Sequence, residues 1–239
     1  GAGKTTLFDI PDLMSECLQR PSVGQAFSLS QSGNPPRCSS LKDLVFQGLG
    51  NYFSIALEVK LPEHIVDALK SSLSDSAKKK PEEHWQFIRY EVRFEIENNK
   101  LVVGTENLFL FPSSKKPERC VARIHGDYTL PKSWRNILLR GSNNISGLRV
   151  ETTKNAKAKD LEVANTLLAL PKVKFESADD YPAASWFHDL LCEKSVFYQP
   201  DLKSLQTASP PGLSDGIMAD AANLPWLALR LQENTSRYI

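Results

Sequence analysis

The feature that most constrains this chain is its opening string, residues 1–7, which reads Gly-Ala-Gly-Lys-Thr-Thr-Leu. Glycines allow backbone angles that other residues avoid, so a loop rich in them can approach a ligand closely. The lysine and the two threonines add one positive charge and two hydroxyls. This arrangement matches the second half of the phosphate-binding loop G-x-x-x-x-G-K-[ST], whose backbone N–H groups surround a phosphate ahead of a helix amino end.

The residues of the string have separate expected roles. Lys4 would contact the β- and γ-phosphates of ATP, the Thr5 hydroxyl would coordinate Mg²⁺, and the Thr6 amide would reach the α-phosphate. The residues predicted to bind the cofactors are Gly1, Ala2, Gly3, Lys4, Thr5 and Thr6. The first glycine of the motif and the strand that leads into it would precede residue 1. We therefore expect an internal piece of a longer protein, truncated at both ends.

The bulk composition is that of an ordinary globular protein. Of the 239 residues, 41% are hydrophobic and 24% are charged, and the net charge is +1. No global field therefore favours nucleic acid or a membrane surface. Cys17, Cys38, Cys120 and Cys192 are scattered and form no C-x-x-C pair, which favours reduced thiols in a cytoplasmic protein. No apolar run is long enough to span a bilayer, so we expect no membrane partner.

Residue patterns predict one helix followed by antiparallel strands. Apolar residues follow helical spacing over 4–20, with a kink or early break expected at Pro11 because proline removes a backbone donor. Residues 21–40 read as a loop, and 62–79 as a short helix. Alternating apolar residues and intervening turn residues predict strands over 51–60, 87–96, 101–111 and 119–125.

From about residue 158 the pattern returns to helix. Helices are predicted over 160–168, 183–191 and 223–233, and the Ser-Pro-Pro-Gly stretch within 207–216 indicates a linker or turn. The expected organisation is a P-loop remnant and helix (1–20), an antiparallel β-rich lobe (41–150) and a mainly helical region (151–239).

The opening string resembles the G-A-G-K-T-T-L of ABC-type ATPase heads, which include the SMC, Rad-type and RecF proteins. Almost the whole chain resembles the predicted bacterial AAA family ATPases that share this head. Besides the string, the segments that carry the likeness are Ser39–Phe46, Phe53–Val59, Arg89–Phe94 with its R-Y-E sequence, Thr105–Leu108 and Asp220–Ala228. Of all these segments only the P-loop string is chemically specific, and the others are markers of the fold.

The resemblance implies an α/β protein of α+β character, with the P-loop helix packed on an antiparallel β subdomain and a helical region after it. In such heads an apolar strand ends in Asp-Glu, where Asp orders Mg²⁺ and Glu positions the attacking water. No run of four apolar residues followed by Asp-Glu occurs in this sequence. We therefore place no catalytic residue within this chain and expect it to be inactive alone.

Four other features leave alternatives open. Leu213–Gly216 resembles the signature loop of these heads, but the prolines before it favour a linker. Gln199 is either a sensor of Mg²⁺ and water or a polar residue at a strand end. His188 is either a catalyst or, as its aromatic neighbours favour, a partly buried structural residue, and a loop or helix start is favoured over acid–base work for Asp179 and Asp180.

The sequence thus predicts ATP binding and, in the complete protein, ATP hydrolysis by an SMC/RecF-like head that forms a homodimer when ATP binds. A DNA-linked role follows from the resemblance alone. The alternative is a non-catalytic binding or regulatory module with a residual P-loop. A P-loop kinase or GTPase is disfavoured, because those folds continue with alternating strands and helices, whereas an antiparallel run follows here.

Overall fold

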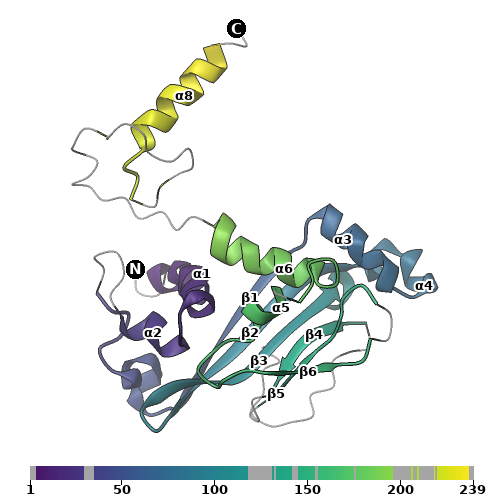
Figure 1. Ribbon diagram of the computed structural model, residues 1–239, viewed down its shortest axis with the longest axis horizontal. Helices are drawn as coiled ribbons and strands as arrows, with labels where there is room; N and C mark the ends of the chain where they lie inside the picture. The colour runs from purple at the N-terminus through teal and green to yellow at the C-terminus, as the bar shows by residue number, and fades with distance from the viewer. Residues whose placement is uncertain are drawn as a thin grey trace. The chain divides into compact units, whose positions relative to one another are not determined.

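The computed structural model divides the chain into two compact units, Gly1–Glu193 and Lys194–Ile239. The structure describes residues 4–29, 35–117, 131, 133–141, 145–153, 156–174, 176–195, 206, 209, 218 and 220–236 (Figure 1). The first unit is an α+β structure with a six-stranded antiparallel sheet. In the second unit, helix α8 (Leu224–Ser236) confirms the helix predicted over 223–233.

The sheet is a meander in which each strand pairs with the next one along the chain. Its strands are β1 (Tyr52–Lys60), β2 (Trp85–Glu97), β3 (Lys100–Pro112), β4 (Arg135–Arg140), β5 (Ile145–Leu148) and β6 (Lys159–Glu162). All five pairings are antiparallel. The strands predicted over 51–60, 87–96 and 101–111 are confirmed as β1, β2 and β3. The strand predicted over 119–125 lies outside the described residues.

A tight turn joins the two longest strands, β2 and β3. Asn98 and Asn99 both have positive φ, 48° and 59°. Asparagine tolerates this left-handed region, and two such residues in succession are typical of hairpin turns that match the twist of the strands. The turn predicted from Asn-Asn is therefore confirmed, and it sets the register in which Glu97 faces Lys100.

The two faces of β2 differ in chemistry. Ile88, Tyr90 and Val92 are buried in the main hydrophobic core, whereas Arg89 and Glu91, on the opposite face, form an ion pair at 2.6 Å. This period-two alternation is the pattern by which the strand was predicted. One face of the sheet therefore builds the core with the helices.

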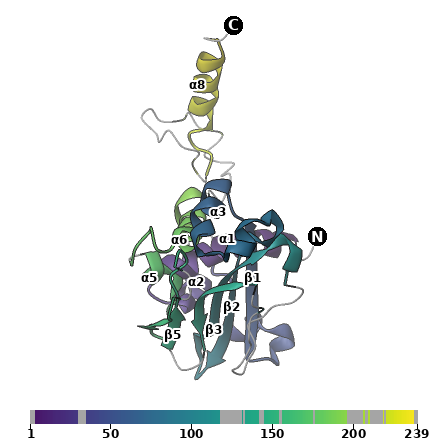
Figure 2. The same ribbon diagram turned by 90° about the vertical axis from the view of Figure 1, so that its right-hand side faces the viewer.

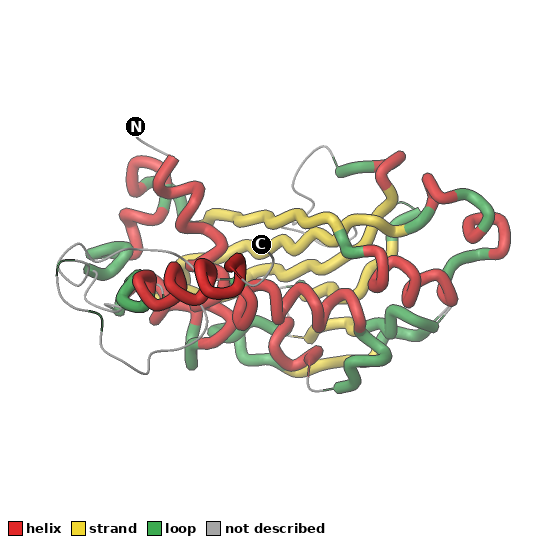
Figure 3. The backbone as a smooth tube through the Cα atoms, turned by 90° about the horizontal axis from the view of Figure 1, so that it is seen from above, coloured by secondary structure: helices red, strands yellow, loops and turns green. Residues whose placement is uncertain are grey.

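The helices of the first unit supply the other side of that core. They are α1 (Lys4–Gln19), α2 (Val23–Ser28), α3 (Glu63–Leu69), α4 (Asp75–Lys78), α5 (Leu170–Lys174) and α6 (Pro182–Asp189), which continues as the π-helical segment η6 (Leu190–Lys194). Short 3₁₀ turns are η1 (Leu41–Leu44), η2 (Phe46–Gly48), η3 (Lys70–Ser72), η4 (Pro81–Glu83) and η5 (Ser113–Lys115). Figure 2 and Figure 3 show α1 and α6 on the same side of the strands. Met14 and Phe187 pack there in one cluster with Tyr90.

The helix predicted over 4–20 is confirmed, and of the kink or early break expected at Pro11 the break does not occur. Helix α1 runs through Pro11 to Gln19. Proline removes only one intrahelical hydrogen bond, whereas the residues beyond it, Met14, Cys17 and Leu18 among them, are buried in the core. Tertiary packing thus outweighs the local penalty.

Three further expectations need correction. The loop predicted over 21–40 contains α2, whose buried Val23, Ala26 and Phe27 already show helical spacing. The helix predicted over 62–79 is divided into α3, η3 and α4. The helix predicted over 160–168 is wrong, because Lys159–Glu162 pairs with β5 as the last strand of the sheet and residues 163–168 are not helical. Pairing with a neighbouring strand overrides helical propensity there.

Candidate functional site

The predicted nucleotide-binding residues lie at the amino end of α1. Gly1, Ala2 and Gly3 fall outside the described residues, and Lys4 and Thr5 open the helix, followed by Thr6. The first N–H groups of a helix have no acceptor within the helix, and they lie at the positive end of its dipole. Residues 4–6 are therefore helical, as the residues that follow a phosphate-binding loop are.

Arg37 ties the segment after α2 to α1. Its Nε and Nη2 donate to the two carboxylate oxygens of Asp9, at 2.9 and 3.1 Å. Nη2 also donates to Asp12 at 2.6 Å, and Nη1 donates to Glu16 at 2.6 Å and to the carbonyl of Ala26 at 3.0 Å. The five N–H groups of the guanidinium are thereby all used. We call Arg37 and the carboxylates of Asp9, Asp12 and Glu16 the Arg37 cluster.

The carboxylates of the Arg37 cluster form one stripe along α1. They occupy positions i, i+3 and i+7, which share a helix face. Burial raises the pKa of Asp12, and its neighbours Glu16 and Asp9 add to the rise, while Arg37 lowers it. Although burial opposes it, hydrogen bonding to Asp9 and Glu16 raises the pKa of Arg37 above its ordinary value. Sequence reasoning missed Arg37, because its partners lie 21 to 28 residues away.

A second polar centre lies inside the first unit at Glu106. Its carboxylate accepts the Tyr90 hydroxyl at 2.7 Å and the backbone amides of Ala169 and Leu170, the latter at 3.0 Å. Arg140 lies 3.6 Å away, and both charged side chains are fully buried. Glu106 was noted in the sequence only as part of a fold marker, and the structure shows it anchoring the start of α5 to the sheet.

Arg140 extends this centre toward the chain ahead of α5. Its Nη1 donates to the carbonyl of Leu167 at 2.6 Å, and its Nη2 donates to the carbonyls of Ala164 at 2.9 Å and Val163 at 3.2 Å. One guanidinium thus holds three carbonyls of an irregular segment. Buried backbone carbonyls need such donors, because water cannot reach them.

Glu151 anchors a different helix. Its two carboxylate oxygens accept the amides of Ala183 at 2.7 Å and Ala184 at 2.9 Å, in the first turn of α6. Burial raises the pKa of Glu151 to about 8, against the lowering effect of those two amides. The Ser72 hydroxyl donates to the Glu151 carbonyl at 2.5 Å, which links η3 to the same point.

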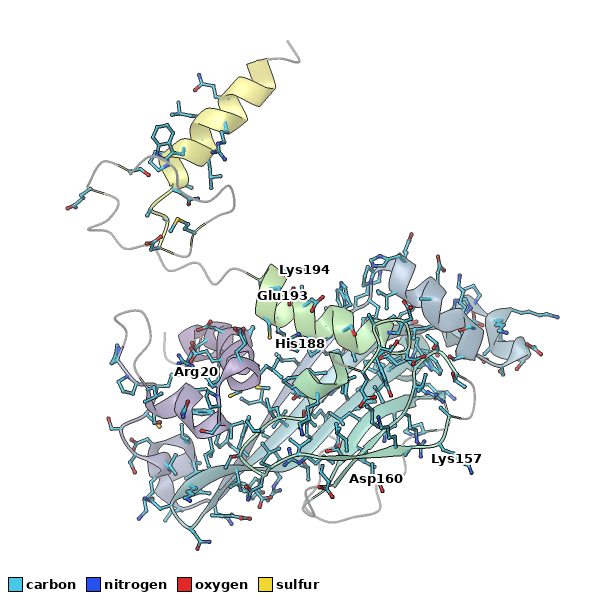
Figure 4. All side chains as sticks on the ribbon, viewed as in Figure 1. Arg20, Lys157, Asp160, His188, Glu193 and Lys194 are labelled. Carbon is cyan, nitrogen blue, oxygen red and sulfur yellow. The ribbon has the colours of Figure 1, made fainter. Side chains whose placement is uncertain are left out.

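The carboxyl end of α6 holds a group of metal-ligand type. One ligand atom each from His188, Asp189 and Glu193 lies within 4.8 Å of the others, and Figure 4 labels His188 and Glu193 there. The π-helical segment η6 changes the helical repeat, which brings residue 193 toward the face of residue 188. Such donors suit a divalent cation, but acidic groups gather without one in many proteins. The His188 side chain is 12% exposed, in keeping with its expected partly buried place.

Other sequence expectations divide between described and undescribed residues. Gln199 and the signature-like Leu213–Gly216 lie outside the described residues. Lys78 and Lys80 form exposed ion pairs with Asp75 and Glu83, so the lysines at the carboxyl end of α4 are solvated. Cys17 and Cys38 are free thiols, and burial raises the pKa of Cys17 to about 12. A thiol with so high a pKa is a poor nucleophile.

Comparison with known proteins identifies no relative. No protein-family model, no curated protein and no solved structure matches this chain. Among the described residues, none of the helices is both long enough and apolar enough to cross a membrane.

Proposed function

We propose that this chain carries the nucleotide-binding part of an ATPase head and binds Mg²⁺–ATP through residues 1–6. The observation that carries the proposal is the position of α1, whose first turn is formed by Lys4, Thr5 and Thr6. These residues follow the last glycine of the string, and the free first amides of a helix can bind phosphate oxygens, which supports the proposal. The helix is also anchored, since its apolar stripe is buried and its acidic stripe is bound by Arg37.

Each group of the site has a defined part in this proposal. The Lys4 ammonium compensates the β- and γ-phosphates, the Thr5 hydroxyl ligates Mg²⁺, and the amides of the glycine loop and of Thr6 receive phosphate oxygens. The acid–base residues for hydrolysis belong to the complete protein. By resemblance to SMC and RecF heads, two such heads would close on ATP as a homodimer, and a DNA-linked role has the same basis.

The test is a titration of the complete protein with a fluorescent ATP analogue in Mg²⁺. We expect Lys4→Ala to weaken binding by about 100-fold or more, because an unshielded ion pair with phosphate is lost. Lys79→Ala is the matched control, since Lys79 is an exposed lysine distant in sequence from the string, and it should bind as wild type. Unchanged affinity of Lys4→Ala would remove the basis of the proposal.

Two further measurements separate the catalytic function from a residual P-loop. ATP turnover by the complete protein, abolished in Lys4→Ala, would identify an ATPase, whereas tight binding without turnover would favour the non-catalytic module. Light scattering with and without ATP tests the homodimer, which should appear only with nucleotide.

A further inference from the structure

The Arg37 cluster carries more negative than positive charge on the helix assigned to nucleotide binding. Asp9, Asp12 and Glu16 bring three carboxylates, and Arg37 supplies one compensating charge. A second arginine, Arg20, reaches Glu16 from the far end of α1 at 3.6 Å. Among the residues whose side chains the structure describes, Arg37 is the cation bonded to the carboxylates nearest to the amino end, those of Asp9 and Asp12.

The acidic stripe of the Arg37 cluster lies close enough to the start of α1 to repel an anion bound there. At a rise of 1.5 Å per residue, Asp9 lies about 7.5 Å along the helix axis from Lys4. The Debye length is about 8 Å at physiological ionic strength, so a carboxylate there is only partly screened from a triphosphate. Arg20, 16 residues from Lys4, lies about 24 Å along the axis and well beyond that length.

Burial strengthens the interaction within the cluster. The Arg37 side chain is 19% exposed and that of Glu16 is 5% exposed. Charges that are partly withdrawn from water interact more strongly and are screened less by salt than exposed pairs. Removal of the guanidinium would leave its partners repelling one another and any anion at the amino end of the helix.

We propose that Arg37 is a positioning and charge-compensating residue of the nucleotide site: it holds α1 through its acidic stripe and cancels the repulsion between that stripe and the triphosphate. The inference rests on the proposed ATP site, and it assigns to Arg37 a role for which the sequence gives no signal. Arg37 acts through α1 and does not itself contact the nucleotide.

The test compares Mg²⁺–ATP affinity among variants of the complete protein. Arg37→Met should bind about tenfold more weakly than wild type at low salt, and the deficit should shrink as salt is added. Arg20→Met, which removes the same charge from the same stripe at its far end, should bind within about twofold of wild type. Equal losses in the two variants would overturn the proposal.

A rescue separates charge compensation from a merely structural role. In Arg37→Met/Asp9→Asn/Asp12→Asn the repelling carboxylates are gone, so affinity should return to within about threefold of wild type even though the hydrogen bonds are not restored. A triple variant that folds, by circular dichroism, but binds as weakly as Arg37→Met would overturn the charge mechanism.

Asp9→Asn alone keeps the test open if Arg37→Met fails to fold. With Arg37 present this change adds net positive charge near the site, and affinity should rise about two- to threefold. Weaker binding would contradict the proposal. Lys4→Ala separates a failure of the proposed ATP site from a failure of the proposed role of Arg37. If Lys4→Ala binds ATP as wild type does, the ATP site itself is wrong. If Lys4→Ala loses binding and Arg37→Met does not, only the role of Arg37 is refuted.

Discussion

Glu106 and Glu151 are two buried carboxylates with the same role in different surroundings. Each accepts hydrogen bonds from two successive backbone amides at the start of a helix, α5 for Glu106 and α6 for Glu151. Neither side chain is exposed. Glu106 also accepts the Tyr90 hydroxyl and faces Arg140 at 3.6 Å. The cation that lowers the pKa of Glu151 is Arg135, whose guanidinium donates hydrogen bonds to the backbone carbonyls of Val150 and Thr153.

This difference shows how the same contact to a helix start can be made with or without a countercharge. Burial raises the pKa of both carboxyl groups. At Glu106 the Tyr90 hydroxyl, the Ala169 amide and Arg140 oppose the rise, so the charged form has several partners. At Glu151 burial raises the pKa to about 8, close to physiological pH. One anchor therefore has an arginine 3.6 Å away, and the other is a buried acid whose contribution to stability depends on pH.

The largest effect is expected from Glu106→Ala. This change leaves the fully buried Arg140 guanidinium without its countercharge and removes the acceptor of the Ala169 and Leu170 amides. Breaking a buried pair from one side costs about 3–5 kcal/mol. Urea denaturation followed by circular dichroism should show that loss in the free energy of unfolding.

Glu106→Gln and Arg140→Met serve as the controls for this ion pair. Glu106→Gln keeps the shape, and Glu106→Gln/Arg140→Met removes both charges, so the double variant should be less destabilised than the sum of the singles. Strictly additive losses would mean that Glu106 and Arg140 do not interact, and the contrast with Glu151 would fail.

A pH titration of stability tests the other anchor. The pKa of Glu151 is about 8 in the folded state, above its ordinary value of 4.5. Between pH 4.5 and pH 8 the folded state therefore holds a proton that the unfolded state has released. Its contribution is therefore full below about pH 4.5 and is lost as pH rises toward 8. We expect a decline of about 2–3 kcal/mol in the unfolding free energy between pH 5 and pH 7.

Glu151→Gln shows which part of that decline comes from this residue. The variant cannot titrate at position 151, so its stability should change less across pH 5–7 than that of wild type, although one α6 amide then faces an N–H group. Parallel curves for the two proteins would place the pH dependence elsewhere.

The local elements were largely predictable from sequence, whereas the anchors were not. Alternation identified β1 to β3, and helical spacing identified α1 and α8, because periodicity is carried by neighbouring residues. The start of α2 had the same kind of signal in Val23, Ala26 and Phe27, but the surrounding Ser, Gly and Pro residues obscured it. Strand β6 was mistaken for helix because a short edge strand is defined by its partner, β5.

The anchors depend on contacts between residues far apart in the chain. Glu106 bonds to amides 63 and 64 residues later, and Glu151 bonds to amides 32 and 33 residues later. A single sequence has no periodicity at such separations. The string of the proposed P-loop is the opposite case, since its chemistry would lie within a few consecutive residues, and the structure adds to it that residues 4–19 are helical.

The smallest expected effect comes from Tyr90→Phe, which makes the Glu106 anchor more like the Glu151 anchor. The change removes one buried hydroxyl donor at 2.7 Å and leaves the ring packed against Phe187. A hydrogen bond to a charged group contributes about 1.5–3 kcal/mol, and we expect the lower end because Arg140 and the two amides remain. The loss of this donor should also raise the pKa of Glu106 further, so the stability of Tyr90→Phe should decline more steeply with rising pH than that of wild type. Denaturation at pH 5 and pH 8 measures both effects.

An identical dependence of unfolding free energy on pH in Tyr90→Phe and wild type would contradict this prediction. It would mean that Arg140 and the two amides alone set the pKa of Glu106. The contrast between the two anchors would then rest on Arg140 and not on Tyr90.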